Sequence, residues 1–289
     1  MSRSLSDFDP SNSKPSVLYG LPENVQYCSS CVISNQRPNS TIEFFNEVGI
    51  EKKTIKFTNG ICDACRVASR KQEIDWQSRE DELWDLCDRY RSSDGTYDCV
   101  VPGSGGKDSF FAAHILKHKF KMHPITVTWA PHLYTDWGRK NHDSWINAGH
   151  DNLLMTPNRR VHRLLTRLAT ENLLHPFQPF MLGQKLLAPR LAQQLGIELV
   201  FFGENEAEYG NPQSDHESPL RAPNFYSEGE GRALRIGGVS LSTLVTDYGL
   251  ELADLNAYLP LDAGSTVAKT QVHYLGYYLK WHPQAAYYY

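Results

Sequence analysis

The sequence predicts an α/β protein, a doubly wound parallel sheet preceded by a small zinc-ribbon module. From residue 96 onward, short apolar runs alternate with helical periodicity, which is typical of a parallel sheet covered by helices on both faces. A glycine-rich loop follows the first of these runs. Two Cys-x-x-Cys pairs lie upstream, in a segment too poor in apolar residues to form its own core.

The expected elements of the α/β part are justified one by one from periodicity and from turn residues. An apolar run over residues 97–101 stops at Pro102 and predicts a strand. Leucines that fall on one face predict the helix over residues 159–174. Gly196 leads into the most strand-like run of the chain. The order is strand 97–101, helix 109–120, strand 124–129, strand 152–155, helix 159–174, helix 184–195 and strand 197–202.

Composition limits the classes of function. The 289 residues are 40% hydrophobic, which suits about two domains. The 29 Lys+Arg against 33 Asp+Glu give a formal net charge of −4, which argues against a general nucleic-acid binder. No apolar run approaches the roughly 20 residues of a membrane span, and the N-terminus lacks a secretory signal. We therefore expect a cytoplasmic protein.

Four segments are expected along the chain. Residues 1–24, rich in Ser, Pro and Asn, form a mobile tail. Residues 25–70 form the zinc-ribbon module, with an alternating, β-like stretch over residues 41–45. Residues 71–95 carry an amphipathic linking helix, and residues 96–289 form the α/β domain. The chain stops inside an aromatic run, which predicts a C-terminal truncation or, alternatively, a docked terminal segment.

The first strand is followed by a candidate anion-binding loop. Its members are Ser104, Gly105, Gly106, Lys107, Asp108 and Ser109. The glycines allow close backbone approach, and the N-terminus of the following helix supplies N–H groups to a phosphate. Lys107 adds a positive charge, and Asp108 is placed to hold Mg²⁺ against the phosphates. The alternative is a glycine-rich turn with a plain helix cap.

This loop resembles the PP-loop of the ATP pyrophosphatase superfamily. It is not a Walker A loop, because Asp108 follows Lys107 where that motif requires Ser or Thr. The resemblance implies a Rossmann-like PP-loop ATPase domain that cleaves ATP between the α- and β-phosphates and holds the departing pyrophosphate. Lys107 and Asp108 would then be the catalytic residues.

The two Cys-x-x-Cys pairs match a structural zinc site that four thiolates close. Its predicted ligands are Cys28, Cys31, Cys62 and Cys65. No coordination position remains open, so the metal would fold the module rather than do chemistry. The alternatives are unligated buried cysteines and a redox pair. Cys87 and Cys99 are expected to be core residues.

Other candidates lie at the ends of the later strands. Thr128 and Trp129 end the second strand and would flank the adenine, unless they are core residues. Glu204, with Glu206 and Glu208, follows the 197–202 strand and would contact Mg²⁺ or substrate, unless this loop is simply solvated.

Two further segments have alternative interpretations. Residues 175–180 form either a shaped substrate loop or a connector between helices. A face bearing Arg160, Arg163 and Arg167 would either meet a nucleotide-sugar diphosphate or be solvated.

Several stretches together resemble the N-acetyl sugar amidotransferases of lipopolysaccharide and nonulosonic acid biosynthesis. They are residues 27–38, 60–65, 74–76, 104–109, 128–131, 134–136, 175–180, 183–185 and 203–210. The resemblance implies conversion of an acetamido group on a sugar or nucleotide sugar into an acetamidino group with ATP and ammonia. Ammonia would come from a glutaminase through a cyclase-like partner, both related to the subunits of imidazole glycerol phosphate synthase.

Two rival functions remain at this point. A tRNA-thiolating PP-loop enzyme shares the zinc-ribbon start, but many such enzymes use cysteines beyond the loop, and none follows Cys99 here. A scaffold with a degenerate loop would not turn over ATP, although the loop shows no degeneration. The function expected from the sequence is therefore that of an ATP-dependent sugar amidotransferase synthetase subunit.

Overall fold

A five-stranded parallel sheet lies at the centre of the computed structural model, which describes residues 21–38, 43–45, 54–203, 218–222, 234–261 and 269–288. The strand order is β5-β4-β3-β6-β9, and every neighbouring pair is parallel. The strands are β3 (Cys99–Pro102), β4 (Pro124–Trp129), β5 (Asp151–Met155), β6 (Leu199–Phe202) and β9 (Gln271–Tyr274).

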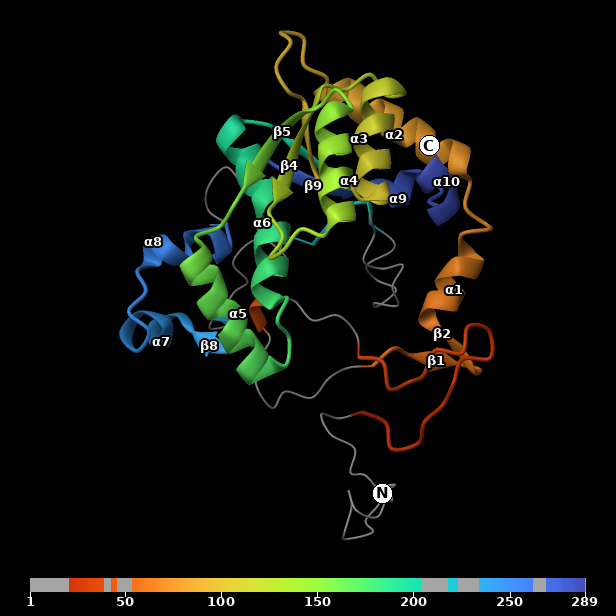
Figure 1. Ribbon diagram of the computed structural model, residues 1–289. Helices are drawn as coiled ribbons and strands as arrows, with labels where there is room; N and C mark the ends of the chain where they lie inside the picture. The colour runs from red at the N-terminus through yellow and green to blue at the C-terminus, as the bar shows by residue number, and fades with distance from the viewer. Residues whose placement is uncertain are drawn as a thin grey trace.

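Helices cover both faces of this sheet (Figure 1), so the prediction of a doubly wound α/β fold is confirmed. Val101 faces a core shared with α2 (Trp76–Tyr90), α3 (Lys107–His118) and α4 (Asp136–Asn147). Val100, its neighbour along β3, faces the opposite core, which is shared with α5 (Arg159–Leu173) and α6 (Gln178–Leu195). Successive strand residues thus bury their side chains on opposite faces, as the period of two requires.

The chain reverses its direction across the sheet between β3 and β6. It runs from β3 outward to β4 and β5, and then returns to place β6 and β9 on the other side of β3. In open α/β sheets, ligands bind outside the carboxyl ends of the strands at such a switch point. A Cβ atom on Gly203, just after β6, would lie 2.6 Å from the carbonyl oxygen of Asp108. The turns that follow β3 and β6 are therefore in direct contact.

Smaller elements complete the described part. A hairpin of β1 (Phe57–Thr58) and β2 (Ile61–Cys62) precedes α1 (Asp63–Arg70). Between β6 and β9, residues of several short elements pack on the core of α5 and α6: β7 (Arg235–Ile236), β8 (Val239–Ser240), α7 (Leu241–Thr246), α8 (Leu252–Leu255) and η6 (Asn256–Tyr258). After β9, α9 (Leu275–Tyr278) packs on α2, and α10 (Pro283–Tyr288) packs on α3 (Figure 1). Within the described ranges, no helix is both long and apolar enough to cross a bilayer.

Several elements differ from the sequence-based expectation. Neither α4 nor β9 was expected, because α4 is mostly polar and β9 opens the aromatic C-terminal run. Helix α6 begins at Gln178 rather than at residue 184, since Pro179 in its first turn needs no intrahelical N–H partner. Much of the expected 175–180 loop is therefore the first turn of a helix.

The expected β-like stretch over residues 41–45 is also different where it is described. Glu43–Phe45 is a short 3₁₀ turn (η2), and Phe44 is buried in the core that α6 helps to form. Gln178 donates a hydrogen bond from Nε2 to the Glu43 carbonyl oxygen at 3.0 Å, and His175 Nε2 lies 3.2 Å from Glu43 Oε2. Phe44 therefore packs onto the α/β domain and does not form one face of a strand.

The amphipathic helix expected after the cysteine module is present as α2, and it also packs on the sheet. Asp75 caps α2 by accepting hydrogen bonds from the N–H groups of Gln77 and Ser78. Leu83, Leu86 and Cys87 are buried against the sheet. The helix is therefore a layer of the α/β domain as well as its connection to the cysteine module. The expected tail, residues 1–24, lies outside the described residues up to residue 20.

Substitution of Gly183 by alanine tests the contact between α6 and β4. A Cβ atom at this buried position would lie 2.2 Å from the Trp129 ring. Alanine favours a helix by about 1 kcal/mol over glycine, but overpacking typically costs about 1–3 kcal/mol. We expect Gly183→Ala to lower the free energy of unfolding, measured in urea. Gln194→Ala, at an exposed position of the same helix, should leave it nearly unchanged. Equal stability of the two variants would contradict this packing.

Candidate functional site

The turn from β3 into α3 contains three glycines, of which Gly103 and Gly105 have no room for a side chain. Gly105 has φ +84°, and a Cβ atom there would lie 2.2 Å from the carbonyl oxygen of Asn141 on α4. A Cβ atom on Gly103 would lie 2.4 Å from Ser109 Cβ. Gly106 is different, because open space surrounds its missing Cβ. The turn is therefore packed tightly on one side, while Gly106 leaves open space where an anion can approach.

Lys107 and Asp108 form a charged pair at the first turn of α3. Lys107 Nζ donates a hydrogen bond to Asp108 Oδ2 at 2.6 Å, and Trp281 Nε1 donates one to Asp108 Oδ1 at 2.7 Å. The Asp108 carboxylate is buried, so both of its oxygens need donors. The ammonium group also lies 5.4 Å from the centre of the Trp281 ring. Sequence reasoning missed Trp281, whose only signal was the aromatic C-terminal run.

The two serines of the loop are placed differently. Ser109 donates a hydrogen bond from Oγ to the Gly106 carbonyl oxygen at 3.1 Å and so closes the turn. Ser104 is exposed and lines a cavity beside the loop. The structure therefore places all six predicted loop residues in one turn, with only some of their side chains available to a ligand.

A cavity of about 240 Å³ opens beside this turn, between the ends of β3 and β4 and helices α4 and α6. Trp129, from the end of β4, forms part of its wall, where the sequence analysis expected a contact with adenine. Thr128 instead lies buried within the sheet, where its Oγ1 accepts a hydrogen bond from Asn152 at 3.1 Å. Glu204, Glu206 and Glu208 lie outside the described residues. The cavity is lined by Pro102, Gly103, Ser104, Gly106, Val127, Trp129, Pro131, Leu133, Tyr134, Thr135, Gly138, Asn141, Phe180, Gln184 and Leu187.

The carboxylate and the ammonium group at the turn suit a nucleotide with bound Mg²⁺. Mg²⁺ in nucleotide sites binds one or two carboxylates together with the phosphates. Asp108 offers such a carboxylate, and each of its oxygens keeps a lone pair beyond the hydrogen bond described above. Lys107 can then move from Asp108 to a phosphate, since its side chain is partly exposed.

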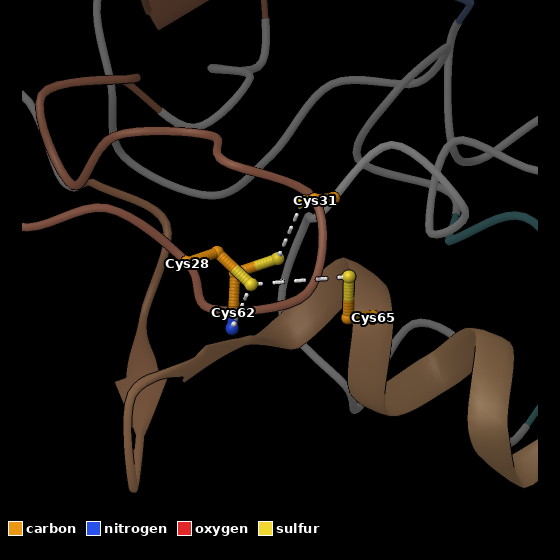
Figure 2. A group of neighbouring side chains, drawn as sticks. All are labelled: Cys28, Cys31, Cys62 and Cys65. Carbon is orange, nitrogen blue, oxygen red and sulfur yellow. Dashed lines mark hydrogen bonds between the residues drawn. The ribbon is translucent and has the colours of Figure 1, made fainter.

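Four cysteine sulfurs converge where the first loop meets the β1–β2 hairpin and α1 (Figure 2). Cys28 and Cys31 come from the loop, Cys62 from the end of β2, and Cys65 from the first turn of α1. All four sulfurs lie within 4.8 Å of one another, with 3.9 Å between Cys28 and Cys65 and 3.6 Å between Cys31 and Cys62. Tetrahedral thiolates about 2.3 Å from one zinc ion are about 3.8 Å apart. The cluster can therefore hold a single metal ion.

The surroundings of this cluster also favour thiolate ligands. The N–H groups of Ser30 and Cys62 donate hydrogen bonds to Cys28 Sγ at 3.4 and 3.3 Å. The Cys62 N–H bond is the main cause that lowers the pKa of the Cys28 thiol to about 6. Burial raises the pKa of Cys62 to about 12, so this thiol ionises readily only with a cation beside it. Among the described residues of this module, the local core has three buried members, Cys28, Ile55 and Cys62, which is little apolar burial to support a fold without a metal.

Comparisons with known proteins give partial similarities. No protein-family model matches the chain. An uncharacterized protein of Methanocaldococcus jannaschii is 32% identical over 77 residues, which is 26% of this chain and 27% of that protein. The match therefore spans about a quarter of that relative.

Three solved structures share part of the fold. An NH₃-dependent NAD synthetase from Campylobacter jejuni has a TM-score of 0.36 at 15% identity and covers 50% of this chain and 64% of its own. A predicted tRNA methyltransferase subunit from Methanocaldococcus jannaschii scores 0.28 at 19% identity and covers 42% and 61%. A U34-tRNA thiolase from Methanococcus maripaludis with a [4Fe–4S] cluster scores 0.28 at 13% identity and covers 62% and 54%. At these scores the similarities do not assign a function.

Paired glycine substitutions test the turn. Gly105→Ala should lower the free energy of unfolding by more than about 2 kcal/mol, because it combines a positive φ with a clash against α4. Gly106→Ala should cost less than about 1 kcal/mol. Its methyl group would nevertheless occupy the space beside the cavity, so we expect ATP affinity to fall at least tenfold, about 1.4 kcal/mol. Urea denaturation and calorimetric ATP titration provide the two readouts. Normal ATP binding by Gly106→Ala would place the phosphates elsewhere.

Removal of one cysteine tests the metal centre. The purified chain should contain about one metal ion per molecule. Cys62→Ser should lose it, since three remaining thiolates leave the tetrahedron open. Cys87→Ala, which removes a buried thiol from α2, should retain it. Elemental analysis with visible absorption gives the metal's identity and ratio. Retention of metal by Cys62→Ser, or an iron–sulfur spectrum, would refute the single-ion assignment.

Proposed function

We propose that the chain is an ATP-dependent, AMP-forming synthetase of the PP-loop type, and that it acts as the amidotransferase component for an acetamido sugar. The observation that carries the proposal is the position of the Lys107–Asp108 turn. It lies at the switch point between β3 and β6, at the N-terminus of α3, and opens on a cavity. A helix N-terminus with a partly exposed lysine beside it is suited to hold the phosphates of a nucleotide.

The proposed reaction activates an amide that ammonia cannot attack directly. The acetamido oxygen attacks the α-phosphorus of ATP, and the bond to pyrophosphate breaks. The lone pair of ammonia then attacks the resulting imidate carbon, a proton leaves the nitrogen, and AMP departs with the former amide oxygen. Mg²⁺, when bound, neutralises charge on the phosphates. Lys107, released from Asp108, and the N–H groups of α3 would stabilise the departing pyrophosphate, while the Asp108 carboxylate would hold Mg²⁺.

The two remaining cysteines favour nitrogen transfer over sulfur transfer. Sulfur carriage needs an accessible thiolate. Cys87 and Cys99 are fully buried. Burial raises the pKa of Cys87 to about 12 and that of Cys99 well above its ordinary value. Within this sequence, the other four cysteines form the cluster that could hold a metal ion. Because the short sulfur–sulfur distances suit one ion rather than a multi-iron cluster, we assign a structural zinc ion there. The glutaminase and cyclase-like ammonia-supplying partners belong to the same proposal.

Product analysis tests this function. The protein is incubated with Mg-ATP, ammonium and a panel of nucleotide-linked acetamido sugars, and the products are identified by mass spectrometry. We expect AMP, pyrophosphate and one sugar in which NH has replaced O. Lys107→Ala and Asp108→Asn should slow AMP formation by roughly 10²–10³-fold, whereas Lys119→Gln, at the far end of α3, should not. ADP as product would refute the mechanism. Thiolation of tRNA in a parallel incubation with Mg-ATP, tRNA and a sulfide donor would establish the rival enzyme.

A further inference from the structure

A second cavity, of about 370 Å³, lies at the carboxyl ends of β4 and β5 and against the first turns of α5. Among its lining residues there are basic and hydroxyl side chains but no carboxylate. They are Ala130, Pro131, His132, Thr156, Pro157, Arg159, His162, Arg163 and Thr166. The lining therefore suits an anion that also accepts hydrogen bonds.

Two arginines provide the charge of this cavity. Arg159 and Arg163 are one helical turn apart on α5, so their like charges face the same side and repel each other. Within the described ranges, neither has an ion pair with a carboxylate. Arg167 provides the contrast on the same helix, because its Nε lies 3.7 Å from Glu171 Oε1. Of the three arginines expected from the sequence to share a face, Arg163 lines the cavity, whereas Arg160 and Arg167 do not. The second arginine of the lining is Arg159.

Two histidines form the rigid inner wall. His162 Nδ1 lies 2.8 Å from the Tyr258 hydroxyl, and His162 Nε2 lies 3.0 Å from His132 Nδ1. His162 is 93% buried, and burial lowers its pKa to about 4, so the imidazole is neutral at neutral pH. The net charge of the wall therefore comes from Arg159 and Arg163. Two guanidinium groups match the two negative charges of a diphosphate diester.

The second cavity shares a wall with the cavity beside the Lys107–Asp108 turn. Pro131 lines both cavities. The ring of Trp129, in the wall of the first cavity, meets the ring of His162 edge-on at 6.3 Å. The two cavities are therefore neighbours at the carboxyl edge of the sheet.

We propose that this second cavity binds the diphosphate of an activated acetamido sugar and so presents the acetamido group to the ATP site. The inference rests on the proposed function and adds the substrate class, a sugar joined through a diphosphate to a nucleoside or a lipid. An RNA backbone is less suited to this cavity, because RNA binding requires an extended basic surface and the chain has a formal net charge of −4.

Calorimetric titration tests the site with three probes: UDP-N-acetylglucosamine, farnesyl-diphosphate-linked N-acetylglucosamine and free N-acetylglucosamine. The full chain should bind at least one diphosphate and bind the free sugar more weakly. The double variant Arg159→Gln/Arg163→Gln should lose at least about tenfold in diphosphate affinity but keep its ATP affinity. Arg167→Gln is the matched control and should behave as the unsubstituted protein. Melting temperatures verify folding. Which of the two diphosphate probes binds shows whether the substrate's diphosphate is joined to a nucleoside or to a lipid.

The possible results separate the two proposals. Arginine-dependent diphosphate binding without AMP formation would support this site and refute the proposed function. AMP formation with diphosphate affinity unchanged in the double variant would support the function and overturn the site. Absence of binding by both diphosphates, or equal loss in Arg167→Gln, would overturn the site. So would an arginine-dependent affinity for tRNA in place of the diphosphates.

Discussion

The close approach of three backbones at one end of the sheet is the constraint on which the candidate site depends. The β3–α3 turn meets α4 through Gly105 and meets the end of β6 through Gly203. Any side chain at these two positions would separate the segments. Because the turn is held from both sides, the N-terminus of α3 points in one direction, and its N–H groups need no rearrangement to receive an anion. Hydrogen-bond donors that are already fixed in place stabilise the charge of a transition state most effectively, because they need not reorient during the reaction.

The C-terminal segment completes that arrangement from a distance. Trp281 follows α9 and donates a hydrogen bond to the buried carboxylate of Asp108. Without this donor, one oxygen of Asp108 would be left with no partner in a poorly solvated position, which is costly. The aromatic run that looked unusual in the sequence thus has a physical reason: it covers α2 and α3 and supports the charged pair.

The parts of the site that were predictable from the sequence are those encoded locally. The turn before α3 and the two cysteine pairs depend on spacing within a few residues, and the structure brings each set together. The misses depend on partners far along the chain. Thr128 ends a strand as expected, but Asn152 on the neighbouring strand engages its hydroxyl. Arg159 could not be distinguished from Arg160 by helical periodicity, because the position of the cavity depends on how α5 packs. Polar α4 carries too few apolar residues to reveal itself, and only His142 and Trp145 are buried along it.

The segment that links the two cysteine pairs also packs on the α/β domain, although the sequence suggested separate units. Phe44 lies in the chain between Cys31 and Cys62, and its ring is buried against the domain core near the start of α6. A bound metal would join the two ends of this segment. It would thereby reduce the conformational entropy that the segment has before Phe44 docks. Docking of Phe44 and closure of the cysteine cluster therefore favour each other, since each reduces the freedom that the other must remove. The same α6 carries Gly183 against Trp129, in the wall of the cavity. The segment between the two cysteine pairs therefore packs against the same helix that forms one wall of the cavity beside the Lys107–Asp108 turn.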